Sequence, residues 1–425
     1  MDKRFFNLFN LTEDQAIALL DTPQTQISED DSRYIAASHL VNFPTERSIN
    51  ALIRAIEKTD SSLDNRIVRR KSLETLGRLQ AEQALPIIRT CLIDEDCYTV
   101  ENAVWAIGEI GTKNASILEE VAQLLDKPGQ AYRVIIHTLA KLEYKAALEK
   151  IRTFVNADDQ LTASAAISAV CRFTGDYTLM EKVVALLQHP KVFTRRLSIQ
   201  DLIDTKYYQA IPNIASCPVS VVFRLRAIRI LTKMGIEKGE ISFEAIQPYL
   251  EQTLRDHPGD LDLAHSDHQP PSLQRLVKDL YDTDFRRCYL ASKIILEHYS
   301  DTAPTELFTT YEQEAHNDYG AHFHVMKLFG WLKHLPAYDL LVEALHNRQP
   351  QYQKSRAAAA IALGELGDQR AIRELKTSLE TKIWDLKYAA LMALEKLGDT
   401  SSLEIAANDQ DWLIQQKVKK GKILS

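Results

Sequence analysis

The feature that most constrains this fold is a segment that returns about every 31 to 34 residues along the chain. One copy reads Tyr98-Thr-Val-Glu-Asn-Ala-Val-Trp-Ala-Ile-Gly108-Glu-Ile-Gly111. The residues equivalent to Gly108 in the other copies are Gly77, Ala140, Cys171, Ile203, Gly330, Gly364 and Glu395. One helical hairpin cannot bury its own apolar face, so copies at this spacing are expected to stack as helix pairs. The sequence therefore predicts an all-α fold, an α-solenoid wound as a superhelix.

The regularity of the copies predicts how the chain is organised. An N-terminal cap, a first repeat block, an irregular connection and a second repeat block are expected at residues 1–30, 31–234, 235–283 and 284–425. In the cap, Phe5 and Phe9 precede an N-capped helix that begins near Thr12. The connection is expected to be irregular because Pro, Gly and Asp crowd a loop near 257–271.

Length, charge and apolar runs narrow the class of protein. A chain of 425 residues is too long for one compact core, but a solenoid buries its core continuously along its length. The formal net charge of -7 argues against a protein that coats nucleic acid, since phosphate contacts need clustered Lys and Arg. The N-terminus lacks the apolar core of a signal peptide, and no stretch approaches the roughly 18 apolar residues of a membrane span. We expect a cytoplasmic protein without a nucleic-acid partner.

The cysteines and histidines do not form metal-site motifs. The five cysteines are scattered without a C-x-x-C pair, which argues against a disulfide framework and against zinc or iron–sulfur sites. His257, His265 and His268 are expected to be solvated loop residues, and histidines two apart in the run 316–324 would point to opposite sides of a helix. The sequence also lacks the usual nucleotide-binding, hydrolase and zinc-protease motifs. No metal site is predicted.

Three positions on the first helix of each copy do not follow the buried apolar pattern. Their spacing of four puts them on one helix face, where stacked copies would align them into a ribbon of charged and aromatic groups. The triplets are Arg70/Glu74/Arg78, Glu101/Trp105/Glu109, Arg133/His137/Lys141, Ser164/Ser168/Arg172, Arg196/Gln200/Asp204 and Phe323/Lys327/Trp331. One interpretation is a set of solvated ion pairs, such as Arg70 with Glu74. A Trp and a His gain little from solvent, so Trp105 and His137 favour a site for an aromatic ligand.

Doubled arginines are a second candidate feature. Arg195 and Arg196 stand together, and similar pairs occur within 67–71, 223–226 and 285–287. The repeat itself prefers only one Arg in this part of each copy. The additional guanidinium groups could hold carboxylate or phosphate groups of a ligand in bidentate fashion.

The copy that begins at Tyr98 and the copy Lys354-Ser-Arg-Ala-Ala-Ala-Ala-Ile-Ala-Leu-Gly-Glu-Leu-Gly-Asp resemble the HEAT-like repeats of cyanobacterial phycobilin lyases of the E/F type. The resemblance extends from about Tyr34 to the end of the chain, whose length is similar to that of the single-chain Y type. It implies a lyase that attaches an open-chain tetrapyrrole, phycocyanobilin or phycoerythrobilin, to a cysteine of an apo-phycobiliprotein subunit. The bilin is then a substrate, and no cofactor is permanently bound.

The resemblance also suggests roles for the candidate residues. Glu101 or Asp204 would protonate or hydrogen-bond the bilin nitrogens. The bilin-binding candidates are Tyr98, Trp105, Glu109, Tyr132, Arg133, His137, Arg195 and Arg196. Among these, the arginines would bind the propionates, and the aromatic side chains would stack on the bilin or orient it. Isomerising lyases of this kind can carry an Asn-His-Cys motif, and this sequence has no His-Cys dipeptide, so ligation without isomerisation is expected.

A second function is compatible with the same repeats, because a solenoid is a general binding surface. HEAT-like relatives of the lyases serve as scaffolds or chaperones without catalysis, binding phycobiliproteins or an iron–sulfur assembly protein. The sequence leaves open which bilin and which acceptor cysteine are used, and whether a second lyase subunit takes part.

Overall fold

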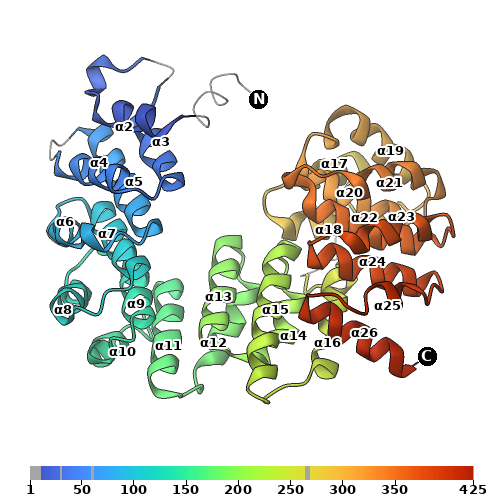
Figure 1. Cartoon of the computed structure of the whole chain (residues 1–425). Coiled ribbons are helices and arrows are strands. Elements are labelled where there is room, and N and C mark those ends of the chain that lie inside the picture. Colours follow the sequence, from blue (N-terminus) through green and yellow to red (C-terminus); the bar gives the residue numbers. More distant parts are fainter. Residues whose placement is uncertain (1–10, 29–30, 59–61, 264–268, 425) are drawn as a thin grey trace. The chain divides into compact units, whose positions relative to one another are not determined.

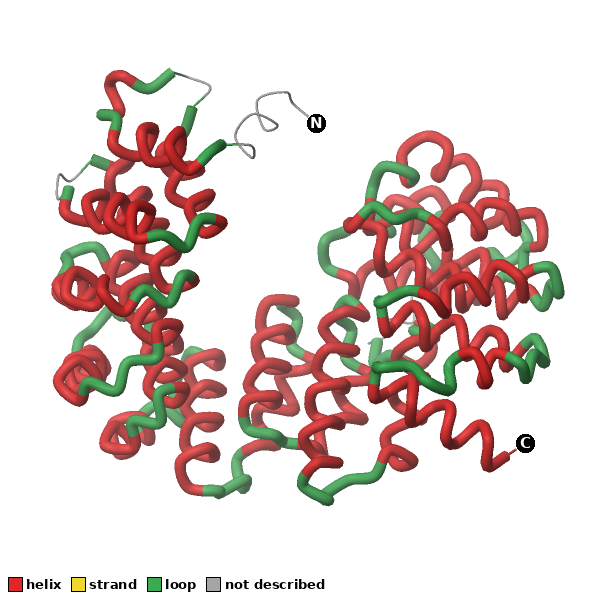
Figure 2. Tube along the Cα trace, viewed as in Figure 1, coloured by secondary structure: helices red, strands yellow, loops and turns green. Residues whose placement is uncertain are grey.

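The computed structural model of the chain describes residues 11–28, 31–58, 62–263 and 269–424, and in these residues all regular structure is helical (Figures 1 and 2). α-Helices alternate with short loops and single turns of 3₁₀ or π helix, which confirms the all-α prediction. The chain divides into two compact units, Met1–Met180 and Glu181–Ser425. In the described part of the chain, no helix has both the length and the apolar character of a membrane span.

Unit 1 is the regular helix-pair stack that the repeat predicts. Its helices are α2 (Glu13–Asp21), α3 (Arg33–His39), α4 (Glu46–Glu57), α5 (Leu63–Arg78), α6 (Leu85–Thr90), α7 (Cys97–Ile110), α8 (Ala115–Gln123), α9 (Tyr132–Lys141), α10 (Leu148–Arg152) and α11 (Gln160–Thr174). The longer helices α5, α7, α9 and α11 pack side by side in chain order (Figure 1). Each shorter helix packs against the longer helix that follows it, so neighbouring pairs cover each other's apolar faces.

The small residues of the repeat lie where neighbouring helices approach most closely. A Cβ atom on Gly77 of α5 would lie 2.9 Å from the Cα atom of Ala106 on α7. A Cβ atom on Gly108 would lie 3.0 Å from the hydroxyl oxygen of Thr138 on α9. Apolar residues of the same helices are buried, with Leu73 and Ile107 as examples. The spacing that defines the repeat is therefore the spacing of its helix contacts.

The N-terminal helix begins as its sequence predicts. Thr12 caps α2 with its hydroxyl oxygen, which accepts from the backbone N–H of Gln15 at 3.3 Å. The Gln15 side chain accepts in return from the backbone N–H of Thr12 at 2.9 Å, which completes a capping box. Phe5 and Phe9, the proposed apolar partners of this cap, lie outside the described residues.

Unit 2 is also built of packed α-helices. Its helices are α13 (Val192–Asp204), α14 (Ile211–Ser216), α15 (Val221–Glu237), α16 (Phe243–Arg255), α17 (Leu273–Asp279), α18 (Phe285–His298), α19 (Ala303–Thr310), α20 (Tyr319–Trp331), α21 (Tyr338–His346), α22 (Gln353–Leu366), α23 (Ala371–Thr377), α24 (Trp384–Lys396), α25 (Ser402–Ile405) and α26 (Trp412–Leu424), and α12 (Met180–Ala185) lies at the unit boundary. The helix α22 packs between α20 and α24. The C-terminal part of the unit also contacts α15 and α16. Arg229 of α15 donates to both carboxylate oxygens of Asp411, the residue before α26, at 3.1 and 2.6 Å, and Lys417 of α26 donates to Glu251 of α16 at 3.0 Å.

The organisation differs from the sequence prediction in two respects. The segment 235–283 holds two helices, α16 and α17, which lack the repeat signature and therefore were not predicted. The unit boundary after Met180 falls inside the predicted first block. The repeat pattern continues across this point, so the sequence does not mark a boundary there. Within 257–271 the described residues contain one 3₁₀ turn, Pro258–Asp260, and no α-helix. His265 and His268 lie outside the described residues.

Candidate functional site

The predicted ribbon is best formed on one face of α7 and α9 in unit 1. Glu101, Trp105 and Glu109 follow one another at intervals of four on α7, and all three are half-buried. The Trp105 ring reaches across to α5, where its Cζ3 atom lies 3.0 Å from the place of a Cβ on Gly77. Glu109 accepts from the ammonium group of Lys141 on α9 at 2.7 Å. This contact joins the triplets of two neighbouring repeats, as the ribbon predicts.

The carboxyl group of Glu101 differs electrostatically from its neighbour on the same face. Burial raises its pKa above the ordinary value, because the charged form loses hydration. Glu109 instead has a cationic partner. An aromatic ring between a carboxyl group of raised pKa and a paired carboxylate is an arrangement that can contact a flat, nitrogen-rich ligand.

The other candidates of unit 1 have varied surroundings. Tyr98 is 57% exposed, and the guanidinium carbon of Arg70 lies 4.8 Å from its ring centroid. Tyr132 donates to the carbonyl of Lys127 at 2.8 Å. Arg133 donates to the carbonyl of Leu161 at 2.8 Å, which occupies one of its nitrogens. Arg133 is a member of the predicted ribbon, and all three side chains are partly engaged in local contacts.

The ion pairs of this face differ from the pair that the sequence suggests. Arg70 binds the carboxylate of Asp96 at 2.7 and 2.8 Å, so its partner comes from the turn before α7. Glu74 pairs with Arg78 at 2.6 Å and also with Lys71. The interpretation of the ribbon as simple pairs within one helix is thus correct for Glu74 with Arg78, but not for Arg70.

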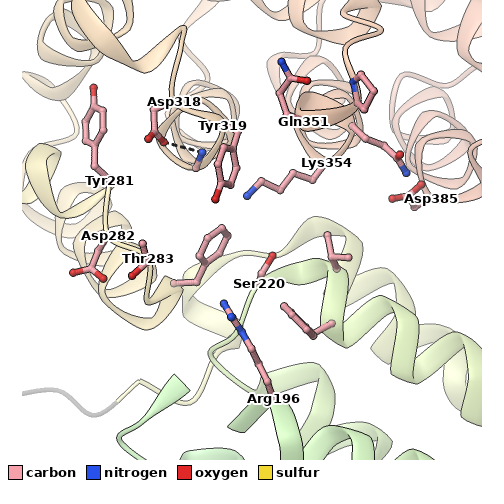
Figure 3. A pocket seen from close by; sticks show the side chains of 16 residues that line it. Arg196, Ser220, Tyr281, Asp282, Thr283, Asp318, Tyr319, Gln351, Lys354 and Asp385 are labelled. Carbon is pink, nitrogen blue, oxygen red and sulfur yellow. Dashed lines mark hydrogen bonds between the residues drawn. The ribbon is translucent and has the colours of Figure 1, made fainter. Parts of the chain in front are cut away.

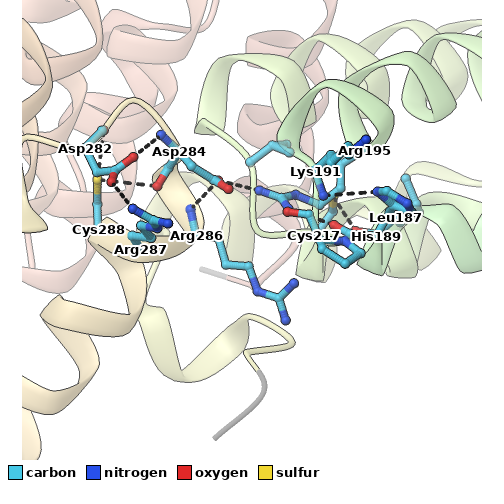
Figure 4. Close-up of polar contacts among 12 residues, drawn as sticks. Leu187, His189, Lys191, Arg195, Cys217, Asp282, Asp284, Arg286, Arg287 and Cys288 are labelled. Atoms are coloured by element: carbon cyan, nitrogen blue, oxygen red, sulfur yellow. Dashed lines mark hydrogen bonds and ion pairs between the residues drawn. The ribbon is translucent and has the colours of Figure 1, made fainter.

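The two adjacent arginines of α13 in unit 2 have different surroundings. Arg195 is 0% exposed and donates to the carbonyls of His189 and Pro190, at 2.8 and 2.9 Å (Figure 4). Its other terminal nitrogen contacts the carboxylate of Asp284, which caps α18. These contacts give Arg195 a structural position between α13 and α18. Arg196 is half-buried, and its guanidinium carbon lies 4.7 Å from the centroid of the Phe223 ring.

The catalytic candidate of unit 2 is Asp204, at the end of α13. Its Oδ1 atom accepts from the side-chain amide of Gln200 at 2.7 Å, within the same helix. Both side chains are half-buried, so this triplet position lies on a partly covered face.

Part of the predicted ribbon in unit 2 is wrong. Phe323 and Lys327 of α20 are buried, with Lys327 only 4% exposed, rather than placed on a polar face. The Lys327 ammonium group contacts the carboxylate of Asp256 and donates to its backbone carbonyl at 2.7 Å. The end of α16 covers this face of α20, and periodicity within one helix does not reveal such a long-range contact. In unit 1, Ser164 and Ser168 of α11 are buried as well, so this triplet also departs from the predicted polar face.

A buried charged cluster of unit 2 surrounds Asp256. Arg224, Lys327 and Tyr289 all direct donors to its carboxylate, and all four side chains are buried. Burial alone would raise the pKa of Asp256, but the two cations outweigh it and hold the pKa below the ordinary value. Since every member has a partner, the cluster is a packed network rather than an open site.

An open pocket of about 630 Å³ lies in unit 2, and the sequence did not predict it (Figure 3). The 16 lining residues include Arg196 of the predicted site, four aromatic residues (Phe223, Tyr281, Phe285 and Tyr319), and one further cation, Lys354. Lining residues also come from the starts of α15, α18, α20, α22 and α24. No group of three or more metal-binding side chains occurs among the described residues.

Comparisons with known proteins agree on the repeat type. The family model described as HEAT repeats matches residues 326–418, and the model described as PBS lyase HEAT-like repeat matches residues 68–94. The two matches fall in the second and first predicted blocks, respectively.

Two curated relatives match almost the whole chain. The uncharacterized phycocyanin operon protein Y of Pseudanabaena tenuis is 64% identical over 417 residues, which cover 98% of this chain and 99% of that protein. The bilin biosynthesis protein CpeY of a Synechococcus species is 31% identical over 415 residues, which cover 93% of this chain and 97% of that protein. Among solved structures, the CpcE–CpcF complex of phycocyanin lyase from a Nostoc species has a similar fold. Its TM-score is 0.50 at 24% identity, with 57% of this chain and 95% of that chain covered.

Proposed function

The chain belongs to the phycobilin lyase family, and from this premise we propose that it binds an open-chain tetrapyrrole and attaches it to a cysteine of an apo-phycobiliprotein subunit. The observation that carries the proposal is the similarity to a bilin biosynthesis protein over nearly its full length. The proposal specifies ligation without isomerisation, with phycocyanobilin or phycoerythrobilin as substrate.

The proposed reaction is an addition, and its atoms balance without a further reactant. The partner's cysteine sulfur forms a bond to the ring A ethylidene of the bilin, and the thiol proton is transferred to the adjacent carbon. No group leaves, and no oxidant or reductant is needed. The nucleophile belongs to the partner. In this chain four of the five cysteines, Cys91, Cys171, Cys217 and Cys288, are buried, and none of them is assigned a role.

The chain itself would polarise and orient the bilin. Glu101 can hold a proton because burial raises its pKa, and from the face of α7 it could donate that proton toward a pyrrole nitrogen. Trp105 offers an aromatic surface on the same face, and His137 lies half-buried on α9. A bilin fixed in one orientation presents one side to the incoming thiolate, which accounts for selective attachment.

The proposal can be tested by co-expressing the chain with bilin-synthesising enzymes and candidate apo-subunits. We expect the Glu101→Gln/Trp105→Ala double variant to lower the rate of bilin attachment at least about 100-fold, because it removes both the proton donor and the stacking surface. Attachment is measured by zinc-enhanced fluorescence of the separated subunits.

The matched control is Glu95→Gln, which changes an exposed carboxylate of the same unit. This control should attach the bilin at the wild-type rate. If the double variant also attaches the bilin at that rate, Glu101 and Trp105 have no part in the mechanism.

A further inference from the structure

We propose that the pocket of unit 2 binds a conjugated ligand that carries carboxylate groups, with Lys354 and Arg196 as its two cationic contacts. The identity of the ligand rests on the proposed function, which makes it a bilin with two propionates. The assignment of the site rests on the pocket itself.

The first argument is that neither cation is paired with a carboxylate of the described residues. Lys354 forms no ion pair with any carboxylate of the described residues, and its ammonium nitrogen lies 4.3 Å from the centroid of the Phe285 ring. It also lies 5.1 Å from the centroid of Tyr319. Arg196 likewise has no carboxylate partner in the described part of the chain, and its buried Nε atom lacks a hydrogen bond. Partly buried cations without counter-ions favour an anionic ligand.

The second argument is that two carboxylates on the pocket wall are already engaged. Asp318 caps α20, since its Oδ1 atom accepts from the backbone N–H groups of Gly320 and Ala321 at 2.8 and 2.7 Å. Asp282 accepts from Arg287 at 3.0 Å and from the N–H of Asp284 at 2.7 Å. Neither carboxylate is paired with the pocket cations.

The third carboxyl group of the wall, Asp385, differs from the other two in that its pKa is raised. Burial raises its pKa, although its Oδ1 atom accepts from the backbone N–H of Leu386 at 3.1 Å. A carboxyl group in such a place can accept a hydrogen bond from a pyrrole N–H or hold a proton near it. The pocket lining thus includes a carboxyl group as well as two cations, which matches a ligand with both nitrogens and carboxylates.

Two helix starts add to the positive character of the pocket. The helices α15 and α22 begin at its wall, with Ser220 and Tyr352 as their N-cap residues. Neither residue makes a side-chain capping hydrogen bond. In the first turns, the N–H groups of Phe223 and Gln353 donate to the carbonyls of Ser220 and Pro350. The positive ends of the two helix dipoles still favour an anion. They reinforce the charges of Lys354 and Arg196.

The size and the walls of the pocket suit a conjugated molecule. A volume of about 630 Å³ lies within the range of roughly 300–1,000 Å³ that is typical of small-molecule sites. Phe223, Phe285 and Tyr319 present aromatic surfaces, and Figure 3 shows the Lys354 ammonium group pointing toward Tyr319. Arg196 enters from a different helix. Cations at separate places on an aromatic wall can bind two carboxylates of one extended ligand.

Lys354 gives the site a pH dependence. Burial lowers the pKa of its ammonium group to about 8. The titratable groups that interact electrostatically with the Lys354 ammonium group are Cys288, Asp318, Asp256, His322, His324 and Lys327. A neutral amine does not attract a carboxylate, so affinity should be highest below pH 8 and fall as the pH rises above it. Lys327 titrates near the same pH but is paired with Asp256, so it does not contact the pocket ligand.

The test is a titration of the full chain with biliverdin, an open-chain tetrapyrrole with two propionates, followed by absorbance. We expect Lys354→Gln and Arg196→Gln each to raise the Kd about 10- to 100-fold, because each removes a charge-assisted contact. The control Lys382→Gln changes an exposed lysine of the same unit and should leave the Kd unchanged. Biliverdin dimethyl ester, which lacks the carboxylates, should bind the wild type at least about 10-fold more weakly.

A conservative variant distinguishes the loss of the positive charge from a loss of the fold. Lys354→Arg should keep tight binding and lose the decline above pH 8, since a guanidinium stays charged there. Helical circular dichroism of each variant verifies that the fold is intact.

The outcomes distinguish this site from the proposed function. A wild-type chain that does not bind biliverdin, or a Kd unchanged in both Gln variants, overturns the site. Attachment in co-expression together with an unchanged Kd in those variants leaves the function standing without the site. Pocket-dependent binding without any attachment supports the site and contradicts the lyase activity.

Discussion

Two lysines of unit 2, one buried and one half-buried, differ in their contact partners. Lys327 contacts the carboxylate of Asp256 inside a network that also includes Arg224 and Tyr289. Lys354 is partly buried among aromatic rings and has no carboxylate partner in the described residues. The first lysine is therefore part of the packed interior, while the second can serve a ligand.

The Asp256 network predicts a large effect of a single substitution. Asp256→Asn should lower the free energy of unfolding by about 3–5 kcal/mol, because it leaves two buried cations without their anion. Asp256 has a φ of 51°, a conformation that Asn also adopts readily, so the backbone should not contribute to the loss. Urea denaturation measures the change.

The control for this substitution is Asp260→Asn, at an exposed position nearby. It should change the free energy by no more than about 0.5 kcal/mol. A loss of similar size in both variants would contradict the importance of the network. Because the pKa of Asp256 is lowered, its contribution is complete above the unfolded value of about 4 and is lost as the pH falls through the folded pKa.

At the scale of single helices, the C-terminal helix α26 is joined to α15 by Arg229. Besides its two bonds to Asp411, this guanidinium lies 4.6 Å from the ring centroid of Trp384 and 5.7 Å from that of Trp412. Arg229→Lys should loosen α26, since an ammonium group cannot make the bidentate contact. We expect backbone amides of α26 to exchange hydrogen at least about 10-fold faster, as measured by mass spectrometry.

Arg226→Lys is the matched control, because Arg226 lies on the same helix and makes an exposed contact with Gln200 at 2.9 Å. Exchange in α26 should be unchanged in this variant. Equal exchange in both variants would show that the Arg229 contact does not hold the C-terminal helix.

The elements that repeat could be predicted from sequence, whereas those defined by distant contacts could not. Gly77 and Gly108 occupy the same position in two copies of the repeat. Because each copy makes the same contact with its neighbour, a small residue at this position predicts close helix packing. The burial of Lys327 depends on Asp256, 71 positions earlier in the chain, so no local pattern announces it. Lys354 was missed for the same reason: its lining partners come from five helices that the sequence does not bring together. Arg196 was named as a candidate ligand contact from the sequence because it stands next to Arg195, where the repeat needs only one arginine.

At the scale of the whole molecule, the chain is a repeat protein of two units that together match relatives of nearly equal length. Unit 1 carries the face of Glu101 and Trp105, and unit 2 carries the pocket of Arg196 and Lys354. Each unit thus carries a separate candidate site. Both are built on rigid helices, which keeps their side chains in fixed positions.

The central claim is that this chain attaches a bilin to a partner's cysteine without isomerising it. The most direct measurement is mass spectrometry of peptides from an apo-phycobiliprotein subunit co-expressed with bilin-synthesising enzymes, together with the absorbance of the attached pigment. We expect one cysteine peptide to gain the mass of the bilin only when the chain is present, with the conjugated system of the bilin shortened by the ethylidene double bond alone. An acceptor that stays unmodified with every bilin and subunit tried, or is modified equally well without the chain, would contradict the account.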